Sequence, residues 1–402
     1  MQSNPFAELF LYNQCFKASF SSIEKIGEGG FGNVYKARSL QDNRLYAIKE
    51  IKIKLNHKKF QRSKAKFESA LNEILFLSLN QSPYVVKLYH AWMEFDKDKS
   101  SSNCLPKPKQ FSSSQLLSKE SVFNAVLSIS KRIRIYIQME LCDSNLNDFI
   151  ASSASHQATN QEMLNRLNVS LQIAKAICDV HRLGIIHRDI KGNNVFINKD
   201  KIQLGDFGLA TFINDEKYKI YNGHNKSLNY HSKEVGTLMY MSPEQKTNYY
   251  NEKSDIYSFG LLLYEIMCPY TCQMEKIEMF SKLKSKGEID NKVLNKRFPQ
   301  IKDLIVSMVN NDMNKRPDMN EVIDILEEEI DRMESIVNRK MSLSVDEEKD
   351  ESTVIESEVM SEGCECNDFL FLFEKENSQY GNRLCLSLSE DDDDDMISCC
   401  SV

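Results

Sequence analysis

Hydrophobic and polar residues alternate over short stretches early in the chain, a pattern that predicts β-strands. The alternation covers 33–37, and a second strand is predicted whose last residues are 46–49. Helical spacing of apolar residues follows at 67–79, and strand character returns at 133–139. The first part of the chain is therefore expected to form a small, sheet-rich lobe around one helix.

Helical patterns dominate from Leu146 to about residue 340, which predicts a larger, mainly α-helical lobe. Its most apolar stretch, 256–270, is interrupted by Glu265 and is shorter than a membrane span, so a buried core helix is expected. The last helix is predicted to begin after the Pro-Asp pair at 317–318 and to pack on its own domain through one apolar stripe: Val322, Leu326, Ile330, Met333 and Val337. The two lobes together indicate a bilobal α+β fold.

Composition changes twice along the chain. Residues 96–130 are rich in Ser, Lys and Pro, which favours a solvated, hydrophilic insert over packed structure. The stretch 341–402 holds 18 acidic residues against 3 basic ones, which predicts an acidic, disordered tail. The predicted organisation is an N-terminal extension, a small lobe with the insert, a large lobe and the tail, with bounds 1–19, 20–141, 142–340 and 341–402.

The cysteines and the N-terminus bear on the cellular compartment. The 11 cysteines are scattered without the C-x2-C pairs of a zinc site, and the first residues lack the basic and apolar regions of a signal peptide. A reducing, cytoplasmic environment without a membrane partner is expected.

A glycine-rich stretch at 27–34 fits the pattern G-x-G-x-x-G-x-V. Because Gly27, Gly29 and Gly32 lack side chains, backbone N–H groups there can approach the phosphates of a nucleotide closely. A dinucleotide-binding loop would lead from a strand into a helix, whereas this one leads into strand-like residues. The stretch therefore favours a loop that covers the phosphates of ATP.

Lys49 lies at the end of the second predicted strand, where its ammonium would pair with nucleotide phosphates and with a carboxylate on the following helix. Glu73 is the candidate partner because it lies within an apolar helical pattern, where an unpaired carboxylate would be costly. The alternatives are that Glu73 is exposed on the polar edge of that helix, or that Glu68 is the partner.

The strongest signal is an H-R-D triplet with an asparagine five residues after its aspartate: His187, Arg188, Asp189 and Asn194. Asp189 would orient a substrate hydroxyl and accept its proton, and Asn194 would bind a Mg²⁺ ion. Lys191 would steady the γ-phosphate, and a lysine at this place is typical of enzymes that act on serine or threonine.

A D-F-G triplet follows at the expected distance, with Asp206 as a Mg²⁺ ligand and Phe207 as a packing switch. Taken alone, the triplet fits a turn equally well. Three further residues are predicted to support the structure: Asp255 as a helix cap that braces the catalytic loop, and Glu244 as the partner of Arg316.

With these motifs in order between residues 20 and 340, the chain resembles the eukaryotic protein kinases over about four-fifths of its length. Within them it is similar to the kinases that phosphorylate the α-subunit of eukaryotic translation initiation factor 2. The similar stretches are 86–92, the insert that follows it, 136–142, 236–245 and 270–275. The ATP site is predicted to comprise Ile26, Gly27, Gly29, Gly32, Val34, Ala47, Lys49, Met139, Glu140 and Cys142.

The resemblance implies a serine/threonine kinase that uses ATP and Mg²⁺ to phosphorylate a serine of that α-subunit, lowering translation initiation under stress. It also implies a homodimer formed through the small lobe, and no direct binding of nucleic acid is expected. Autophosphorylation is expected between Asp206 and Glu244, with Thr237 and Ser232 as the acceptors by family position. The alternative for Thr237 is a structural hydroxyl beside the catalytic aspartate.

In the related kinases the substrate docks on the helix after the one that contains Asp255, which here would span 274–284. Ile277, Phe280 and Leu283 supply apolar side chains there, although they would equally well pack on the lobe. Charge reversal at Lys276 is expected to test the docking.

Two other functions are consistent with the same pattern. One is a serine/threonine kinase of another stress or cell-cycle branch, and the other is a pseudokinase scaffold with the same fold. The residues that discriminate against the scaffold are all intact: Lys49, Asp189, Asn194 and Asp206.

Overall fold

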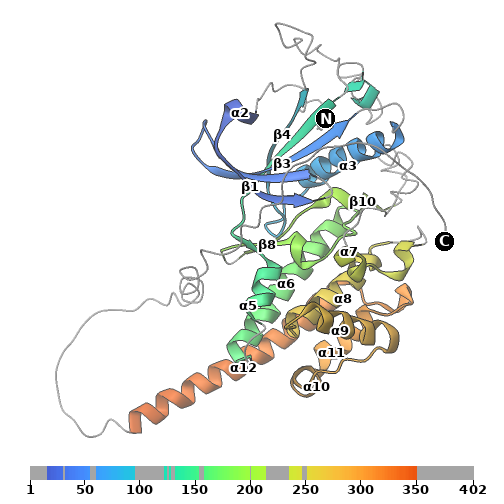
Figure 1. Ribbon diagram of the computed structural model, residues 1–402. Coiled ribbons are helices and arrows are strands. Elements are labelled where there is room, and N and C mark those ends of the chain that lie inside the picture. Colours follow the sequence, from blue (N-terminus) through green and yellow to red (C-terminus); the bar gives the residue numbers. More distant parts are fainter. Residues whose placement is uncertain are drawn as a thin grey trace, which may run out of the picture. The chain divides into compact units, whose positions relative to one another are not determined.

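The computed structural model describes residues 16–29, 32–54, 60–95, 122–124, 126–127, 132–153, 158–199, 201–213, 235–246 and 251–350. All of them belong to one compact unit. Strands dominate its first part and helices its second part, so the predicted bilobal α+β fold is confirmed (Figure 1). The predicted tail beyond residue 350 and most of the insert lie outside the described residues.

The small lobe is built on a five-stranded antiparallel sheet with the strand order β1-β2-β3-β5-β4. Its strands are β1 (Phe20–Gly29), β2 (Gly32–Ser39), β3 (Leu45–Lys54), β4 (Leu88–Phe95) and β5 (Arg132–Met139). β3 continues past its predicted end at residue 49, because Ile51 and Ile53 remain buried and pair with β5. Alternation sends these two side chains to one face of the sheet and Ile48 to the other face, where Phe16 of α2 (Phe16–Ser19) packs.

Helix α3 (Phe60–Leu79) covers the face of the sheet that holds Ile51 and Ile53. α3 begins seven residues before the predicted start at Phe67. The sequence did not indicate this earlier start, because the first turns of the helix are largely polar and show no apolar period. The Ser63 hydroxyl donates a hydrogen bond to the Lys54 carbonyl at 2.6 Å, which fixes the start of α3 to the end of β3.

The described end of the insert, at 122–124 and 126–127, is helical and packed, which corrects the prediction of a solvated loop throughout 96–130. Val122, Phe123 and Val126 have no exposed surface. Apolar residues at this spacing form one side of a helical turn, and that side lies in the same core as α3.

The large lobe is mainly helical. Its longer helices are α5 (Leu146–Ser152), α6 (Asn160–Arg182), α7 (Val235–Tyr240), α8 (Lys253–Met267), α9 (Gln273–Lys286), α10 (Lys292–Arg297), α11 (Pro299–Met308) and α12 (Met319–Asp350). Its short strands and 3-10 helices are β6 (Ser144–Asn145), β7 (Ile185–Ile186), β8 (Val195–Asn198), β9 (Lys201–Leu204), β10 (Thr211–Phe212), η3 (Gly192–Asn194), η4 (Phe207–Leu209), η6 (Pro243–Lys246) and η7 (Met313–Lys315).

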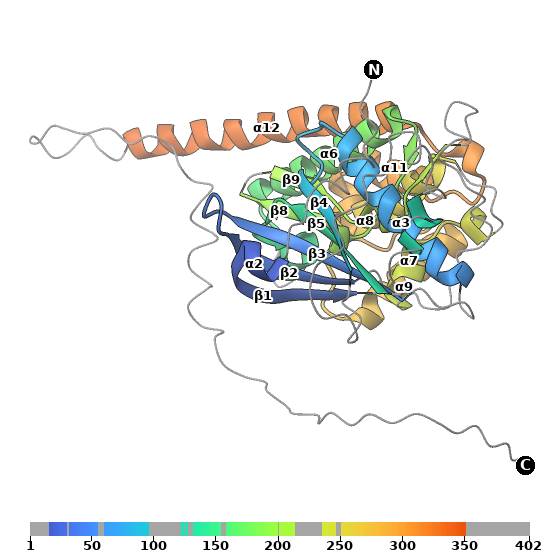
Figure 2. The same cartoon turned by 90° about the horizontal axis from the view of Figure 1, so that it is seen from above.

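Two helices of this lobe were predicted from their apolar patterns. α8 is buried from Ser254 to Met267, so the predicted core helix is present. α12 begins where predicted, with Asp318 accepting hydrogen bonds from the Asn320 and Glu321 amides at 2.8 and 3.0 Å, and it packs along α6 (Figure 2). α12 continues past the predicted boundary at residue 340. None of the described helices is both long enough and apolar enough to cross a membrane.

Candidate active site

Lys49 of β3 is buried between two carboxylates. Its Nζ lies 2.6 Å from Glu73 Oε1 on α3 and 2.7 Å from Asp206 Oδ1. Burial alone would lower the pKa of Lys49, but the negative charges of Asp206 and Glu73 outweigh it and raise the pKa, so the amine stays protonated. Glu73 rather than Glu68 is thus the ion-pair partner, and it lies on the buried side of α3.

Strand register brings residues predicted to bind ATP together on one face of the sheet. Val34 lies opposite Gly27 on one side and opposite Lys49 on the other. Ala47 lies opposite Met139. Since Ala47 and Lys49 are two residues apart on β3, both point to the same face.

The described residues of the glycine-rich stretch form the end of β1 and the start of β2, so the stretch leads into a strand as predicted. A Cβ at Gly32 would lie 2.1 Å from the Glu50 carbonyl oxygen, so only glycine fits there. A Cβ at Gly27 would meet its nearest neighbour at 3.6 Å, which is an ordinary contact. Gly29 ends β1, and Ile26 exposes 48% of its surface. Protein packing therefore requires Gly32 but leaves room beside Gly27.

Asp189, Lys191 and Asn194 form one hydrogen-bonded group. Asn194 Nδ2 donates to Asp189 Oδ2 at 3.0 Å and to the Asp189 carbonyl at 2.8 Å. Lys191 Nζ lies 3.1 Å from the same Oδ2. Because Asp189 is buried, these two donors fix the orientation of its carboxylate.

His187 connects the catalytic loop to the D-F-G triplet. Its Nε2 lies 3.0 Å from the Gly205 carbonyl, which only accepts, so the proton is on Nε2. Nδ1 then accepts from the Asp189 amide at 3.3 Å. The Phe207 ring packs edge-on against the imidazole, with 4.7 Å between the ring centroids. Both residues are fully buried, so they support the site rather than contact a ligand.

Asp255, in the first turn of α8, holds the catalytic loop. Its two oxygens accept hydrogen bonds from the His187 and Arg188 amides, each at 2.7 Å, and His181 Nε2 lies 2.9 Å away. Arg188 has a φ of 68°, a strained conformation that these bonds help to maintain. The predicted brace is present, but Asp255 does not cap its helix: Glu252 is the N-cap residue, and the Asp255 carboxylate binds the loop instead.

The residues after β5 join the two lobes. Glu140 follows Met139, the last residue of β5, and its carboxylate accepts from Asn198 Nδ2 at 2.9 Å and from Gln203 Nε2 at 3.0 Å. An ATP contact from Glu140 would therefore come from its backbone. Burial raises the pKa of the Cys142 thiol to about 12, which keeps this thiol protonated at neutral pH.

Glu244 and Arg316 form the predicted ion pair. Arg316 donates to the two carboxylate oxygens at 2.6 and 2.9 Å, and its side chain is fully buried. The pair joins the end of the segment after the D-F-G triplet to the loop before α12. Of the predicted phosphorylation sites in that segment, Ser232 and the side chain of Thr237 lie outside the described residues.

A sequence model of the protein kinase domain matches residues 20–325. The chain belongs to the protein kinase family. It is 29% identical to the interferon-induced, double-stranded RNA-activated protein kinase of Mus musculus over 318 residues, which cover 78% of this chain and 52% of that protein.

Two further relatives are kinases of initiation factor 2. The chain is 28% identical to eIF-2-alpha kinase GCN2 of Arabidopsis thaliana, over 76% of this chain and 24% of that protein. It is 32% identical to eukaryotic translation initiation factor 2-alpha kinase 3 of Rattus norvegicus, over 48% of this chain and 18% of that protein. The resemblance predicted from the motifs is confirmed, and the kinase spans about half of these relatives or less.

The residues of this kinase fit ATP and Mg²⁺. Mg²⁺ is usually held by one or two protein oxygen ligands together with substrate phosphates and water. Asp206 and Asn194 offer such oxygens, and burial, which would raise the pKa of Asp206, is outweighed by the Lys49 charge, which lowers it. Within the described ranges no group of three or more His, Cys, Asp or Glu side chains is placed to hold a metal ion.

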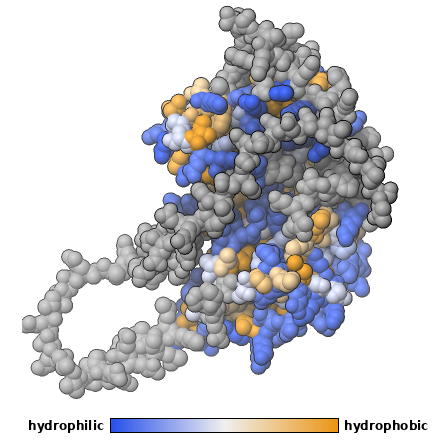
Figure 3. Space-filling model, viewed as in Figure 1, coloured by the Kyte–Doolittle hydropathy of each residue, from blue (hydrophilic) through white to orange (hydrophobic). Residues whose placement is uncertain are grey.

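The helix predicted to dock substrate is α9. Phe280 and Leu283 are each 2% exposed and pack on the lobe, whereas Ile277 is 52% exposed and Met274 78% exposed. Figure 3 shows such hydrophobic side chains at the surface of the helical part, among mostly hydrophilic neighbours. The apolar residues of α9 are thus divided between the core and a surface that is available to a partner.

The prediction that charge reversal at Lys276 would test docking is wrong, because the Lys276 side chain is buried. Its Nζ lies 2.6 Å from Glu265 Oε1 and 2.8 Å from Tyr240 Oη. Glu265 is fully buried on α8 and needs this positive charge, which draws Lys276 inward.

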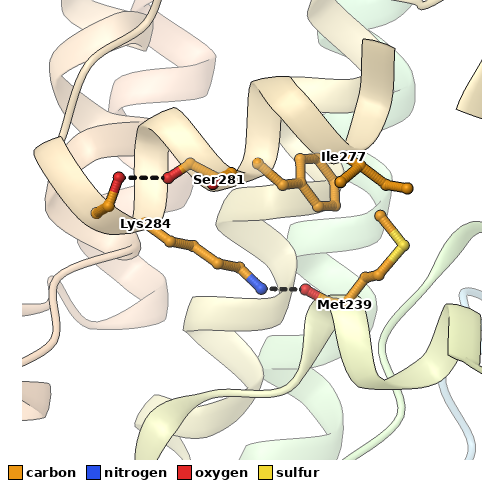
Figure 4. A pocket seen from close by; sticks show the side chains of 6 residues that line it. Met239, Ile277, Ser281 and Lys284 are labelled. Carbon is orange, nitrogen blue, oxygen red and sulfur yellow. Dashed lines mark hydrogen bonds between the residues drawn. The ribbon is translucent and has the colours of Figure 1, made fainter. Parts of the chain in front are cut away.

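A pocket of about 380 Å³ separates α9 from the end of α7. It is lined by Met239, Ile277, Phe280, Ser281, Lys284 and Ser285 (Figure 4). Lys284 Nζ donates to the Met239 carbonyl, which ties the two helices together. Burial, with the charge of Lys246 nearby, lowers the pKa of Lys284 to about 8.

Sequence reasoning missed one contact at the centre of the site. The Ser69 hydroxyl on α3 donates to the Gly208 carbonyl of the D-F-G triplet. Ser69 lies four residues before Glu73, so both side chains are on the same side of the helix. The spacing of four residues from Glu73 was the only sequence signal for this contact. It was not sufficient, because serines occur in helices for many other reasons.

Proposed function

We propose that this chain is an active serine/threonine kinase that transfers the γ-phosphoryl group of ATP to a protein hydroxyl. The observation that supports it best is the buried ion pair of Lys49 with both Glu73 and Asp206. A scaffold has no need of a lysine held at this place by two carboxylates, whereas phosphoryl transfer needs a positioned charge against the phosphates.

Each residue has a definite task in the proposed reaction. Asp189 orients the acceptor hydroxyl and takes its proton, and its carboxylate is already aligned by Asn194 and Lys191. Lys49 binds the phosphates. Asp206 and Asn194 would hold Mg²⁺, which supplies neutralisation of phosphate charge when bound.

The proposed substrate is the α-subunit of initiation factor 2, and phosphorylation of a serine there would lower translation initiation. Two relatives are named as kinases of this factor. Docking is proposed on α9, where Met274 and Ile277 are exposed beside the pocket at the end of α7. A docking surface away from Asp189 would position a folded substrate at the site.

The experiment compares phosphorylation of the purified α-subunit and of a generic basic protein. Ile277→Asp is expected to lower kcat/KM for the α-subunit by about tenfold or more, as for a central contact of an interface. It should leave the generic protein unaffected, because Ile277 lies outside the catalytic group. Val293→Asp on α10 is the matched control, since Val293 is also an exposed aliphatic residue of this lobe.

The outcomes separate the substrate from the activity. Equal loss on both substrates would reject docking through α9. Robust activity on the generic protein with none on the α-subunit would reject the substrate and favour a kinase of another stress or cell-cycle branch. Absence of transfer to either protein would favour the scaffold.

A further inference from the structure

The end of the insert lies against α3 although the insert is predominantly polar. We call its described residues, 122–124 and 126–127, the insert turn. Val122, Phe123 and Val126 are fully buried, and Leu127 packs against the same core. Four apolar side chains in one short helical turn are more than a tether between strands requires.

Phe123 fits between two aromatic rings of α3. Its ring centroid lies 5.4 Å from that of Phe60 and 5.3 Å from that of Phe67. Phe60 and Phe67 are seven residues apart, which places them on the same side of the helix about 10.5 Å apart along its axis. The two centroid distances together match that spacing, so the Phe123 ring fills the gap between them. Sliding or rotation of α3 would therefore push one of its rings into Phe123.

The same helix positions the residues of the candidate active site. Phe67 precedes Glu73 by six residues, or about 9 Å along the axis. Between them Ser69 donates to the Gly208 carbonyl, and Glu73 itself binds Lys49 at 2.6 Å. α3 is thus held by the insert turn on one side and by the catalytic groups on another.

We propose that Phe123 is a positioning residue for phosphoryl transfer. It fixes α3 at the position along its axis at which Glu73 reaches Lys49, without contacting ATP or substrate. This role rests on the proposed kinase activity. The competing explanation is that the insert turn only adds buried area to the small lobe and has no specific effect on the site.

The test compares Phe123→Ala with Phe298→Ala, in which a phenylalanine that is also fully buried is removed from the large lobe. Both variants are expected to lower the thermal midpoint, because both leave a cavity. Only Phe123→Ala should lower kcat/KM for ATP, by about 10- to 100-fold, because displacement of a positioning group by about 1 Å has effects of that size. Only Phe123→Ala should also speed backbone amide exchange at 69–77.

A graded series keeps the test valid if the alanine variant does not fold. Phe123→Leu and Phe123→Val remove progressively more of the volume between the two rings. The loss in kcat/KM and the increase in amide exchange at 69–77 should follow that order, with leucine restoring most of the wild-type behaviour. Phe67→Leu, made on α3 itself, should resemble Phe123→Leu.

Two results are decisive. If the Phe123 variants match Phe298→Ala in kinetics and in amide exchange at 69–77, the turn is only structural and the proposal is overturned. If the wild-type chain transfers no phosphate, the proposed kinase activity fails, and the exchange comparison still decides whether Phe123 fixes α3.

Discussion

At the scale of single residues, each buried charge of the site lies next to an opposite charge or to hydrogen-bond donors that stabilise it. Lys49 lies between two carboxylates, and Asp255 accepts two backbone hydrogen bonds in a fully buried position. An isolated charge at such depth would be costly, whereas these arrangements keep each charge and fix its direction. Asp255 thereby fixes the backbone immediately before Asp189.

Asp189→Asn is expected to lower kcat by about 10²- to 10⁴-fold, the range for loss of a general base. The amide keeps the shape of the carboxylate but cannot accept the proton of the hydroxyl. ATP affinity, measured by calorimetry, should be unchanged, because Lys49 and Asp206 are intact. The exposed Asp303 offers the control Asp303→Asn, and near-normal turnover of Asp189→Asn would remove the catalytic assignment.

Glu244 should make stability depend on pH. Burial by itself raises its pKa, but the hydrogen bonds and charge of Arg316 outweigh it and lower the pKa below the usual 4.5. A carboxyl with a lowered pKa in the folded state contributes stability above its unfolded pKa, and that contribution is lost as the pH falls through the folded value.

Glu244→Gln is therefore expected to lower the thermal midpoint at pH 7 and to flatten its decline below pH 4.5. Thermal unfolding between pH 7 and pH 3 measures both effects. Glu334→Gln, at an exposed position of α12, should follow the wild type at every pH. A Glu244→Gln curve parallel to the wild type would show that the ion pair with Arg316 does not contribute in this way.

At the scale of elements, Lys276 joins three helices. It is bonded to Glu265 of α8 and to Tyr240 of α7, and its ammonium lies 4.9 Å from the centroid of the Tyr240 ring. The proposed docking helix is thus fixed to the end of the segment that follows the D-F-G triplet.

Lys276→Met is expected to destabilise the large lobe by about 3–5 kcal/mol, because the buried Glu265 carboxylate would lose its positively charged partner and keep only the hydrogen bond from the Tyr240 hydroxyl. Lys282→Met on the same helix is the control, since Lys282 is 41% exposed and its pair with Glu278 contributes little. Denaturant unfolding of the two variants measures the difference. Equal, small losses would contradict the assignment of Lys276 to the core.

The elements were predictable where the local sequence carries a signal: strand character in β5, the long apolar stretch of α8 and the Pro-Asp pair before α12. Prediction was incomplete where tertiary contacts determine whether a segment is helical. The polar first turns of α3 are helical because Ser63 is bonded to Lys54, and the insert turn is ordered by two rings of a distant helix. Neither contact has a signal in the local sequence.

In the candidate site, too, contacts between distant segments could be predicted only where the local sequence carries a signal. Glu73 could be predicted, because an acidic residue in an apolar helical pattern needs a partner. Lys276 could not, because its partner Glu265 also lies in a helix, and nothing in either helix indicates that the two meet. Asp255 was predicted as a brace, but its direct hydrogen bonds to the loop amides depend on how α8 packs beneath that loop.

At the scale of the whole molecule, the residues proposed for catalysis come from both lobes. Lys49 and Glu73 come from the sheet-rich part, whereas Asp189, Asn194 and Asp206 come from the helical part. The Lys49–Asp206 bond at 2.7 Å joins the two directly. The proposed phosphoryl transfer therefore depends on how the lobes are placed relative to each other, and the Glu140 hydrogen bonds to Asn198 and Gln203 also maintain that placement.

The most direct test measures transfer of labelled phosphate from ATP to the purified initiation factor 2 α-subunit, followed by identification of the phosphorylated amino acid. The wild-type chain is predicted to form phosphoserine at a rate at least about 10²-fold above that of Asp189→Asn. Equal labelling by the two proteins, or no labelling by a wild-type chain that binds ATP, would contradict the account.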